Sequence, residues 1–186
     1  MLQHGVALDR AGIAAFRDVT FPAAGTASER GRYATGFTMI DYAKRVRDSV
    51  ARNGFHTTSV GAGEKPAFSY STGIYESYAI PEIIISALPP NLSQELISQY
   101  VDRFRATGPI IGERITAAKE RFDYYLVPVP FVRVQDYVLA TIKYYGSDPF
   151  ELLQLIYPDT ELLFPGEDGY DYDQELFGAF PPNHRA

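Results

Sequence analysis

Apolar and polar residues follow two different periods along this chain, and these periods predict its helices and strands. In residues 38–53 the apolar positions recur every three or four residues, which places them on one face of a helix. In residues 68–74 larger side chains alternate with serine and glycine at a period of two, which places the two kinds on opposite faces, as is typical of a strand. These patterns predict, in chain order, a helix over 38–53, strands over 55–60, 68–74 and 82–88, a helix over 91–108, a strand over 124–131, a helix over 134–145 and a strand over 150–157.

Turn-forming and capping residues mark the ends of several of these elements. Gly54 follows the first helix, where glycine is favoured because it adopts the left-handed conformation that ends a helix. Asn91 is the expected N-cap of the second helix. Residues 82–88 are almost wholly apolar, as in a central strand that is buried on both faces. Pro128 and Pro130 lack the N–H that a central strand needs, so residues 124–131 are predicted to form an edge strand.

The order of the elements predicts an α+β fold with a mixed or antiparallel sheet and about three helices. A turn at 61–65 joins two strands into a hairpin, whereas other strands are connected through helices. We expect the helices to cover one face of the sheet. The boundaries predicted for the chain are an N-terminal arm or linker over 1–35, a single compact domain over 36–180 and a tail over 181–186.

Charge and hydropathy disfavour two classes of partner. Acidic residues outnumber basic ones, 23 against 17, which gives a net charge of −6. Such a surface repels phosphate backbones and gains little from counterion release. No apolar run approaches the roughly 18 residues of a membrane-spanning helix. We therefore expect neither nucleic acid nor a membrane among the partners of this protein.

The absence of cysteine narrows the chemistry further. It excludes disulfides, thiolate nucleophiles and zinc–thiolate sites, and it fits the reducing cytoplasm. His4, His56 and His184 do not have the spacing of metal ligands. The acidic run over 167–175 lacks the glycine and the final bidentate glutamate of a calcium-binding loop. We expect a cytoplasmic protein with no metal and no cofactor.

Tyr70, Ser71 and Thr72 carry hydroxyl groups on both faces of the second predicted strand, just before Gly73. One interpretation is a polar wall of a ligand cleft, where the glycine lets a ligand approach the backbone. The other is a buried core strand in which the tyrosine hydroxyl has an internal partner. The segment lacks the first glycine of a nucleophile elbow, and a serine-hydrolase triad would need His56, the one histidine inside the folded body.

Three further polar residues stand in or beside apolar segments. Glu82 opens the most apolar strand, and Arg114 is the cation that we expect to pair with it. Such a buried pair would be architectural, or the arginine would clamp an anionic ligand. Gln154 interrupts an apolar strand, so its amide is expected to bind a backbone turn or to point into the cleft. With residues 70–72, these are the candidate ligand-binding residues.

Six short strings along the chain resemble a bacterial family, domain of unknown function 4262, over roughly residues 38–180. The strings are PAFSYSTGI at 66–74, PEIIISALPP at 81–90, GER at 112–114, YYG at 144–146, LLQLIYPD at 152–159 and LFP at 163–165. The resemblance rests on their order and spacing. It implies a compact α+β fold and a bacterial source, and it implies no established reaction.

The chain departs from the usual form of that family at three positions. Ile80 replaces a histidine before the Pro-Glu pair, Tyr157 replaces a tryptophan, and Gly166 replaces a second tryptophan. If the family acts through that histidine, this chain acts by another route.

Three hypotheses of function follow from these observations. The first is a non-catalytic binding module with a tyrosine-lined cleft for a small ligand or a protein partner, because no nucleophile–base pair, metal cluster or cofactor motif stands in the sequence. The second is a metal-independent hydrolase or transferase that uses glutamate, arginine and tyrosine side chains. The third is a structural homodimer that pairs through an edge strand.

Overall fold

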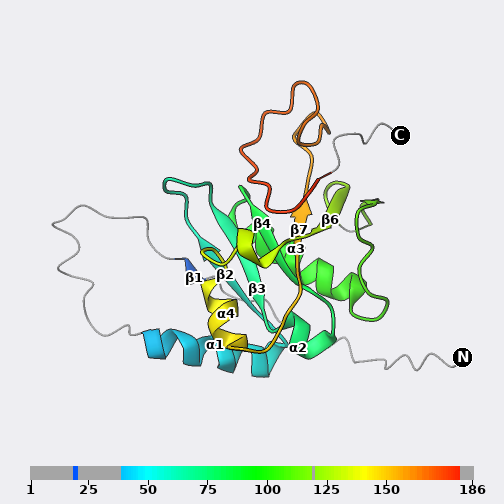
Figure 1. The fold of residues 1–186 in the computed structure, drawn as a ribbon. Helices are drawn as coiled ribbons and strands as arrows, with labels where there is room; N and C mark the ends of the chain where they lie inside the picture. Colours follow the sequence, from blue (N-terminus) through cyan, green and yellow to red (C-terminus); the bar gives the residue numbers. More distant parts are fainter. Residues whose placement is uncertain (1–18, 21–38, 119, 181–186) are drawn as a thin grey trace, which may run out of the picture.

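The computed structural model describes residues 19–20, 39–118 and 120–180, and Figure 1 shows how their helices and strands are arranged. The helices are α1 (Met39–Asn53), α2 (Ile74–Tyr78), α3 (Pro90–Phe104), the 3-10 helix η2 (Phe131–Arg133) and α4 (Leu139–Tyr145). The strands are β1 (Val19–Thr20), β2 (His56–Val60), β3 (Phe68–Thr72), β4 (Glu82–Ser86), β5 (Arg114–Ile115), β6 (Tyr124–Pro128) and β7 (Leu152–Ile156).

The strands of the described residues form one mixed sheet in the order β1-β2-β3-β4-β7-β6-β5. The hairpin of β2 and β3 and the pairs β3–β4, β7–β6 and β6–β5 are antiparallel. β4 and β7 run parallel, as do β1 and β2. This sheet confirms the predicted α+β fold, and it puts the apolar strand β4 at the centre, as its sequence indicated.

Helices cover both faces of the sheet, so the prediction that they share one face is wrong (Figure 1). α3 packs on one face and contacts β2 and β3, whereas α1 and α4 lie on the other face against the same two strands. The reason lies in the side chains: β4 buries its isoleucines in both directions, with Ile83 towards α3 and Ile84 towards the α4 side. Two apolar faces need two covering layers.

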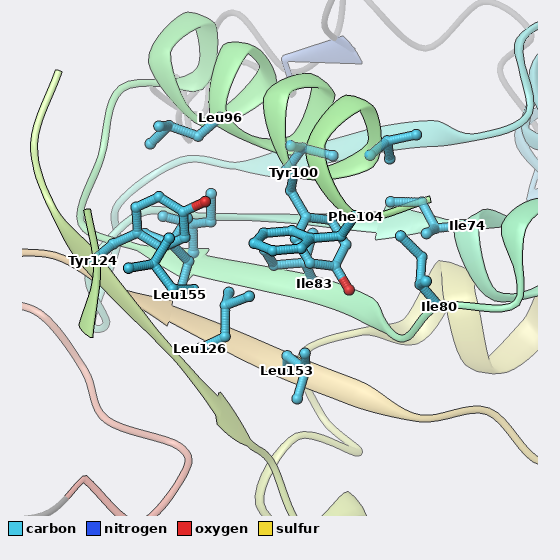
Figure 2. Close-up of a cluster of buried hydrophobic side chains, with 14 of the residues drawn as sticks. Ile74, Ile80, Ile83, Leu96, Tyr100, Phe104, Tyr124, Leu126, Leu153 and Leu155 are labelled. Carbon is cyan, nitrogen blue, oxygen red and sulfur yellow. The ribbon is translucent and has the colours of Figure 1, made fainter. Parts of the chain in front are cut away.

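The larger apolar core lies under α3 (Figure 2). Leu96, Tyr100 and Phe104 stand four residues apart on this helix and point down onto the sheet. They meet Ile83 and Leu153 from the central strands, which are almost completely buried. The hydroxyl of Tyr100 donates a 2.9 Å hydrogen bond to the carbonyl of Pro81, which satisfies it inside the core.

Several predicted boundaries change in the structure. α3 begins at Pro90, so Asn91 lies inside the helix and is not its N-cap; proline suits the first helical position because its missing N–H would have no partner there. β6 is flanked by β7 and β5 and is therefore not an edge strand. The two-residue strand β5 pairs only with Tyr124 and Tyr125, and Pro128 lies beyond that pairing at the other end of β6.

Gln154 binds the C-terminal segment, the described residues 157–180 that follow β7, to the sheet. This segment, orange to red in Figure 1, passes over the ends of β6 and β7 and buries Phe164 and Phe177. The amide oxygen of Gln154 accepts hydrogen bonds from the backbone N–H groups of Phe177, at 2.7 Å, and Gly178, at 3.3 Å. Its amide nitrogen donates to the carbonyl of Glu175 at 2.6 Å.

Replacing Gln154 by leucine is expected to destabilise the C-terminal segment. Each buried backbone group that loses its partner costs about 1–3 kcal/mol. Hydrogen exchange should show loss of protection at the amides of Phe177 and Gly178, while Gln135→Leu, a substitution at an exposed site, should leave these amides protected. Equal protection in the two variants would contradict this role.

Candidate functional site

The carboxyl group of Glu82 is completely buried at the start of β4 and is surrounded by hydrogen-bond donors. Its Oε1 accepts three bonds: from the N–H of Gly73 at 2.7 Å, from the N–H of Tyr75 at 3.1 Å and from the hydroxyl of Tyr145 at 2.6 Å. Its Oε2 accepts a bond from the hydroxyl of Ser71. Four elements, β3, α2, β4 and α4, therefore meet at one carboxyl group.

The local sequence explains why the carboxyl group sits there. Gly73 takes a left-handed conformation, with φ of 98°, which turns the chain from β3 directly into α2. A glycine has no side chain to cap the helix, so the first N–H groups of α2 need another acceptor. Glu82 supplies it. A Cβ at position 73 would lie 2.6 Å from the methyl groups of Val50, so this site accepts only glycine without rearrangement.

Burial dominates the electrostatics of this group. It raises the pKa of Glu82 above its usual value, and the hydrogen bonds from Ser71, Tyr145 and the backbone oppose the rise. Burial and the neighbouring Glu82 in turn raise the pKa of Tyr145, so this phenol stays protonated and donates. The adjacent Tyr144 donates to Glu76 in the same way.

The predicted pair of Glu82 and Arg114 is wrong. Arg114 lies on β5, three strands away from β4 in the sheet, and its Nε donates to Asp123 at 2.9 Å. Its guanidinium lies over the ring of Phe164, 5.4 Å from the centroid. Adjacent strands are about 4.8 Å apart, so two intervening strands keep the arginine away from Glu82. Instead of an arginine, the carboxyl group of Glu82 has only uncharged hydrogen-bond donors among the described residues.

The other predicted residues lie at three locations: beside Glu82 and α4, at the C-terminal backbone and at a cavity. Ser71 joins Glu82, and Thr72 bonds to the hydroxyl of Thr141 at 2.8 Å, which in turn donates to the carbonyl of Ser71 and holds α4 on β3. Gln154 binds the C-terminal backbone, as described above. Tyr70 lines the cavity described next, and the other five residues are not part of that lining.

This cavity has a volume of about 300 Å³ and lies between α1, α4 and the β2–β3 hairpin. Its lining is predominantly apolar. The four tyrosines in this lining are Tyr42 from α1, Tyr70 from β3, Tyr137 from the loop before α4 and Tyr144 from α4. The tyrosine-lined cleft that the sequence predicted thus has a candidate location, built mainly from residues that the sequence analysis did not single out.

The hydroxyl groups of Tyr42, Thr58 and Tyr70, which we call the floor of the cavity, already have hydrogen-bond partners in the protein. Tyr42 and Thr58 share a hydrogen bond of 2.8 Å, and the hydroxyl of Tyr70 accepts one from the N–H of Ala140 at 3.2 Å. Burial raises the pKa of Tyr70 to about 12. At neutral pH this phenol is therefore a neutral donor and acceptor, able to orient a ligand but not to act as a base.

His56 lies next to this floor but is held in the core. Its Nδ1 is 3.1 Å from the hydroxyl of Ser49, which itself donates to the carbonyl of Phe55 at 3.4 Å, so the histidine is the donor of this pair. Burial, with a smaller effect of Arg45, lowers the pKa of His56 to about 4 and keeps the ring neutral. Because its hydroxyl partner is Ser49, it does not serve Ser71 as a catalytic base.

No group of three histidine, aspartate or glutamate side chains in the described ranges is placed to hold a metal ion. None of the described helices is both long enough and apolar enough to span a bilayer.

A family model covers most of the residues that form this geometry. The model of the family described as Domain of unknown function (DUF4262) matches residues 49–171, which is well over half of the chain. The chain belongs to the DUF4262 family. All the donors around Glu82 lie inside the matched DUF4262 region, whereas Tyr42, Val46 and Arg47 on the α1 wall of the cavity precede it. No curated protein and no solved structure matched the chain.

The family departures noted in the sequence fall mainly in packed positions. Ile80 is buried in the apolar core beneath α3, and Tyr157, also buried, donates its hydroxyl to the carbonyl of Ser86 at 2.9 Å. Gly166 has a left-handed φ of 92°. This DUF4262 member therefore has a packed aliphatic side chain at position 80.

Glu82→Gln tests the ionisation of the buried carboxyl group. A raised pKa means that the folded protein binds the proton more tightly than the unfolded chain does, so the wild type loses stability as pH rises above about 4.5. Urea denaturation between about pH 4 and 8 should show the glutamine variant gaining stability relative to the wild type as pH rises. A gain of the wild type over the variant would mean that the four hydrogen bonds outweigh burial.

Gly73→Ala tests the turn that brings α2 to the carboxyl group. The left-handed conformation and the contact with Val50 should together lower the free energy of unfolding by about 2–4 kcal/mol. Gly63→Ala is the matched control, because a Cβ there has no neighbour within 4 Å. Similar stabilities of the two variants in urea would show that residue 73 does not require glycine.

Proposed function

We propose that this protein is a non-catalytic binding module that takes a small organic ligand with an apolar body into the cavity between α1, α4 and the hairpin. The observation that carries the proposal is the cavity itself. Its volume of about 300 Å³ lies at the lower end of the range for small-molecule sites, which are mostly apolar with a few placed polar groups.

The lining suits a flat or branched apolar molecule. Phe68 and Tyr70 stack at 6.1 Å between centroids, and Tyr137 meets Phe68 edge-on at 5.3 Å, so these rings form a continuous aromatic surface. Ala43 and Ala140 have small side chains on the facing helices, which leaves room between them. A ligand in this space would contact ring faces and would reach the hydroxyl groups of the floor.

The chemistry around the cavity supports binding in preference to catalysis. Tyr70 is a weak acid with a pKa of about 12, and His56 is neutral and bound to Ser49. The alternative from the sequence, a hydrolase or transferase built on Glu82 and Arg114, lacks the convergence that it needs, since these residues lie three strands apart.

The source, compartment, partners and oligomeric state of the protein remain predictions from the sequence. We expect a bacterial, cytoplasmic protein that does not bind nucleic acid, and a homodimer formed through an edge strand stays a prediction of the sequence analysis. Sedimentation of the purified chain would measure the last point.

Filling the cavity tests the proposed function. The uncharged fluorophore anilinonaphthalene should bind the wild type saturably at one site, with an increase in fluorescence. Ala43→Phe, which places a ring inside the cavity, should weaken this binding by at least about tenfold, since a filled pocket leaves no room for the probe.

Ala51→Phe is the matched control, because this alanine lies on an exposed part of the same helix and costs the same helix propensity. It should bind the probe as the wild type does. Absence of saturable binding to the wild type, or equal binding by the two variants, would refute a ligand site in this cavity.

A further inference from the structure

We infer that the ligand of this cavity carries an anionic group, a carboxylate, sulfonate or phosphate, which Arg47 and Lys143 bind at its mouth. This inference rests on the proposed function and specifies the chemical class of the ligand: a small amphiphilic anion with its apolar body inside and its charge outside.

The two cations stand on opposite walls of the same opening. Arg47 follows the buried Val46 on α1, and Lys143 lies one turn after Leu139 on α4; all four side chains line the cavity. Arg47 and Lys143 are exposed, whereas Val46 is buried, so the α1 wall changes from apolar to basic towards solvent. On the α4 wall Leu139 is exposed beside Lys143. Arg47 also lies close enough to Tyr144 to oppose the rise in its pKa that burial and Glu76 cause.

Arg47 and Lys143 have no direct ion-pair partner among the described residues, although Arg47 also attracts the neighbouring Asp48. In contrast, Lys44 on the same helix as Arg47 pairs with Asp48 at 2.8 Å. Two cations without an ion pair in the lining of one cavity stand out on a chain with a net charge of −6. An anionic ligand would supply the missing counter-charge.

The acidic residue in the cavity lining, Asp136, has a cation of its own nearby. The ammonium group of Lys65 lies 3.9 Å from the ring centroid of Tyr137. The pKa of Lys65 is raised by its hydrogen bond with Tyr137 and, to a smaller extent, by the charges of Glu175 and Asp136. Asp136 is thus within electrostatic reach of Lys65, which lies outside the cavity lining. The charged side chains of the lining are Arg47, Lys143 and Asp136, so the lining carries a net positive charge.

The residue types fit a terminal anionic group. A guanidinium presents paired N–H donors that match the two oxygens of a carboxylate or the oxygens of a sulfonate or phosphate. A lysine adds a mobile point charge that suits any of these groups. The overall negative charge of the chain disfavours extended polyanions, so the site would select small anions.

Two probes that differ by one group test the inference: uncharged anilinonaphthalene and anilinonaphthalene sulfonate. The measured quantity is the ratio of their dissociation constants. The wild type should bind the sulfonate at least about tenfold more tightly, as expected for a charge-assisted hydrogen bond. This preference should decrease as sodium chloride is added, because salt screens exposed charges.

The double variant Arg47→Gln/Lys143→Gln should reduce the preference to nearly one. The control is Arg52→Gln/Arg121→Gln, which removes the same charge at exposed positions that do not line the cavity, and it should keep the preference. Ala43→Phe should weaken binding of both probes, which would place them in the same cavity.

The outcomes separate the two proposals. If the uncharged probe binds but the wild type shows no preference for the sulfonate, or if both double variants keep the preference equally, the anionic ligand is refuted and the cavity remains a binding site. If neither probe binds the wild type saturably, the proposed function itself fails and this inference fails with it.

Discussion

The structure depends on one buried carboxyl group, that of Glu82, which forms no ion pair with the cations of the described ranges. Removing Glu82 from water is costly, and the cost is offset only because four donors converge on its two oxygens. These donors come from the end of β3, the start of α2 and the last turn of α4. The positions of these elements are therefore coupled, since a shift of any one would remove a hydrogen bond from a buried carboxyl oxygen.

This coupling extends to the candidate binding site. Tyr145 binds Glu82 from α4, and the preceding residue, Tyr144, lines the cavity. α4 is held a second time by the hydrogen bonds of Thr141 to Thr72 and to the backbone of β3. One wall of the cavity is thus fixed by buried polar contacts, which are directional, and not only by apolar packing. A fixed wall is what a preformed ligand site requires.

The two faces of the sheet serve different purposes. Under α3 long side chains such as Tyr100 and Phe104 fill the space between helix and sheet, and this core is densely packed (Figure 2). On the other face α1 and α4 contribute the small side chains of Ala43 and Ala140 at the cavity, and the space between the helices stays open. The face under α3 has the larger cluster of buried apolar side chains, and burial of apolar surface stabilises a fold, whereas the other face has a smaller cluster and the cavity.

The elements with strong local patterns, which are α1, the hairpin and the central strand β4, could be predicted from the sequence together with the α+β class, because the periods of 3.6 and 2 are properties of neighbouring residues. The sequence also indicated that Glu82 and Gln154 are buried polar groups. Their hydrogen-bond partners could be identified only in the folded structure. The partner Tyr145 is 63 residues from Glu82, and the expected Arg114 lies on a distant strand. The cavity likewise combines α1 with α4, whose proximity follows from the order of the strands between them, and no local pattern encodes that order.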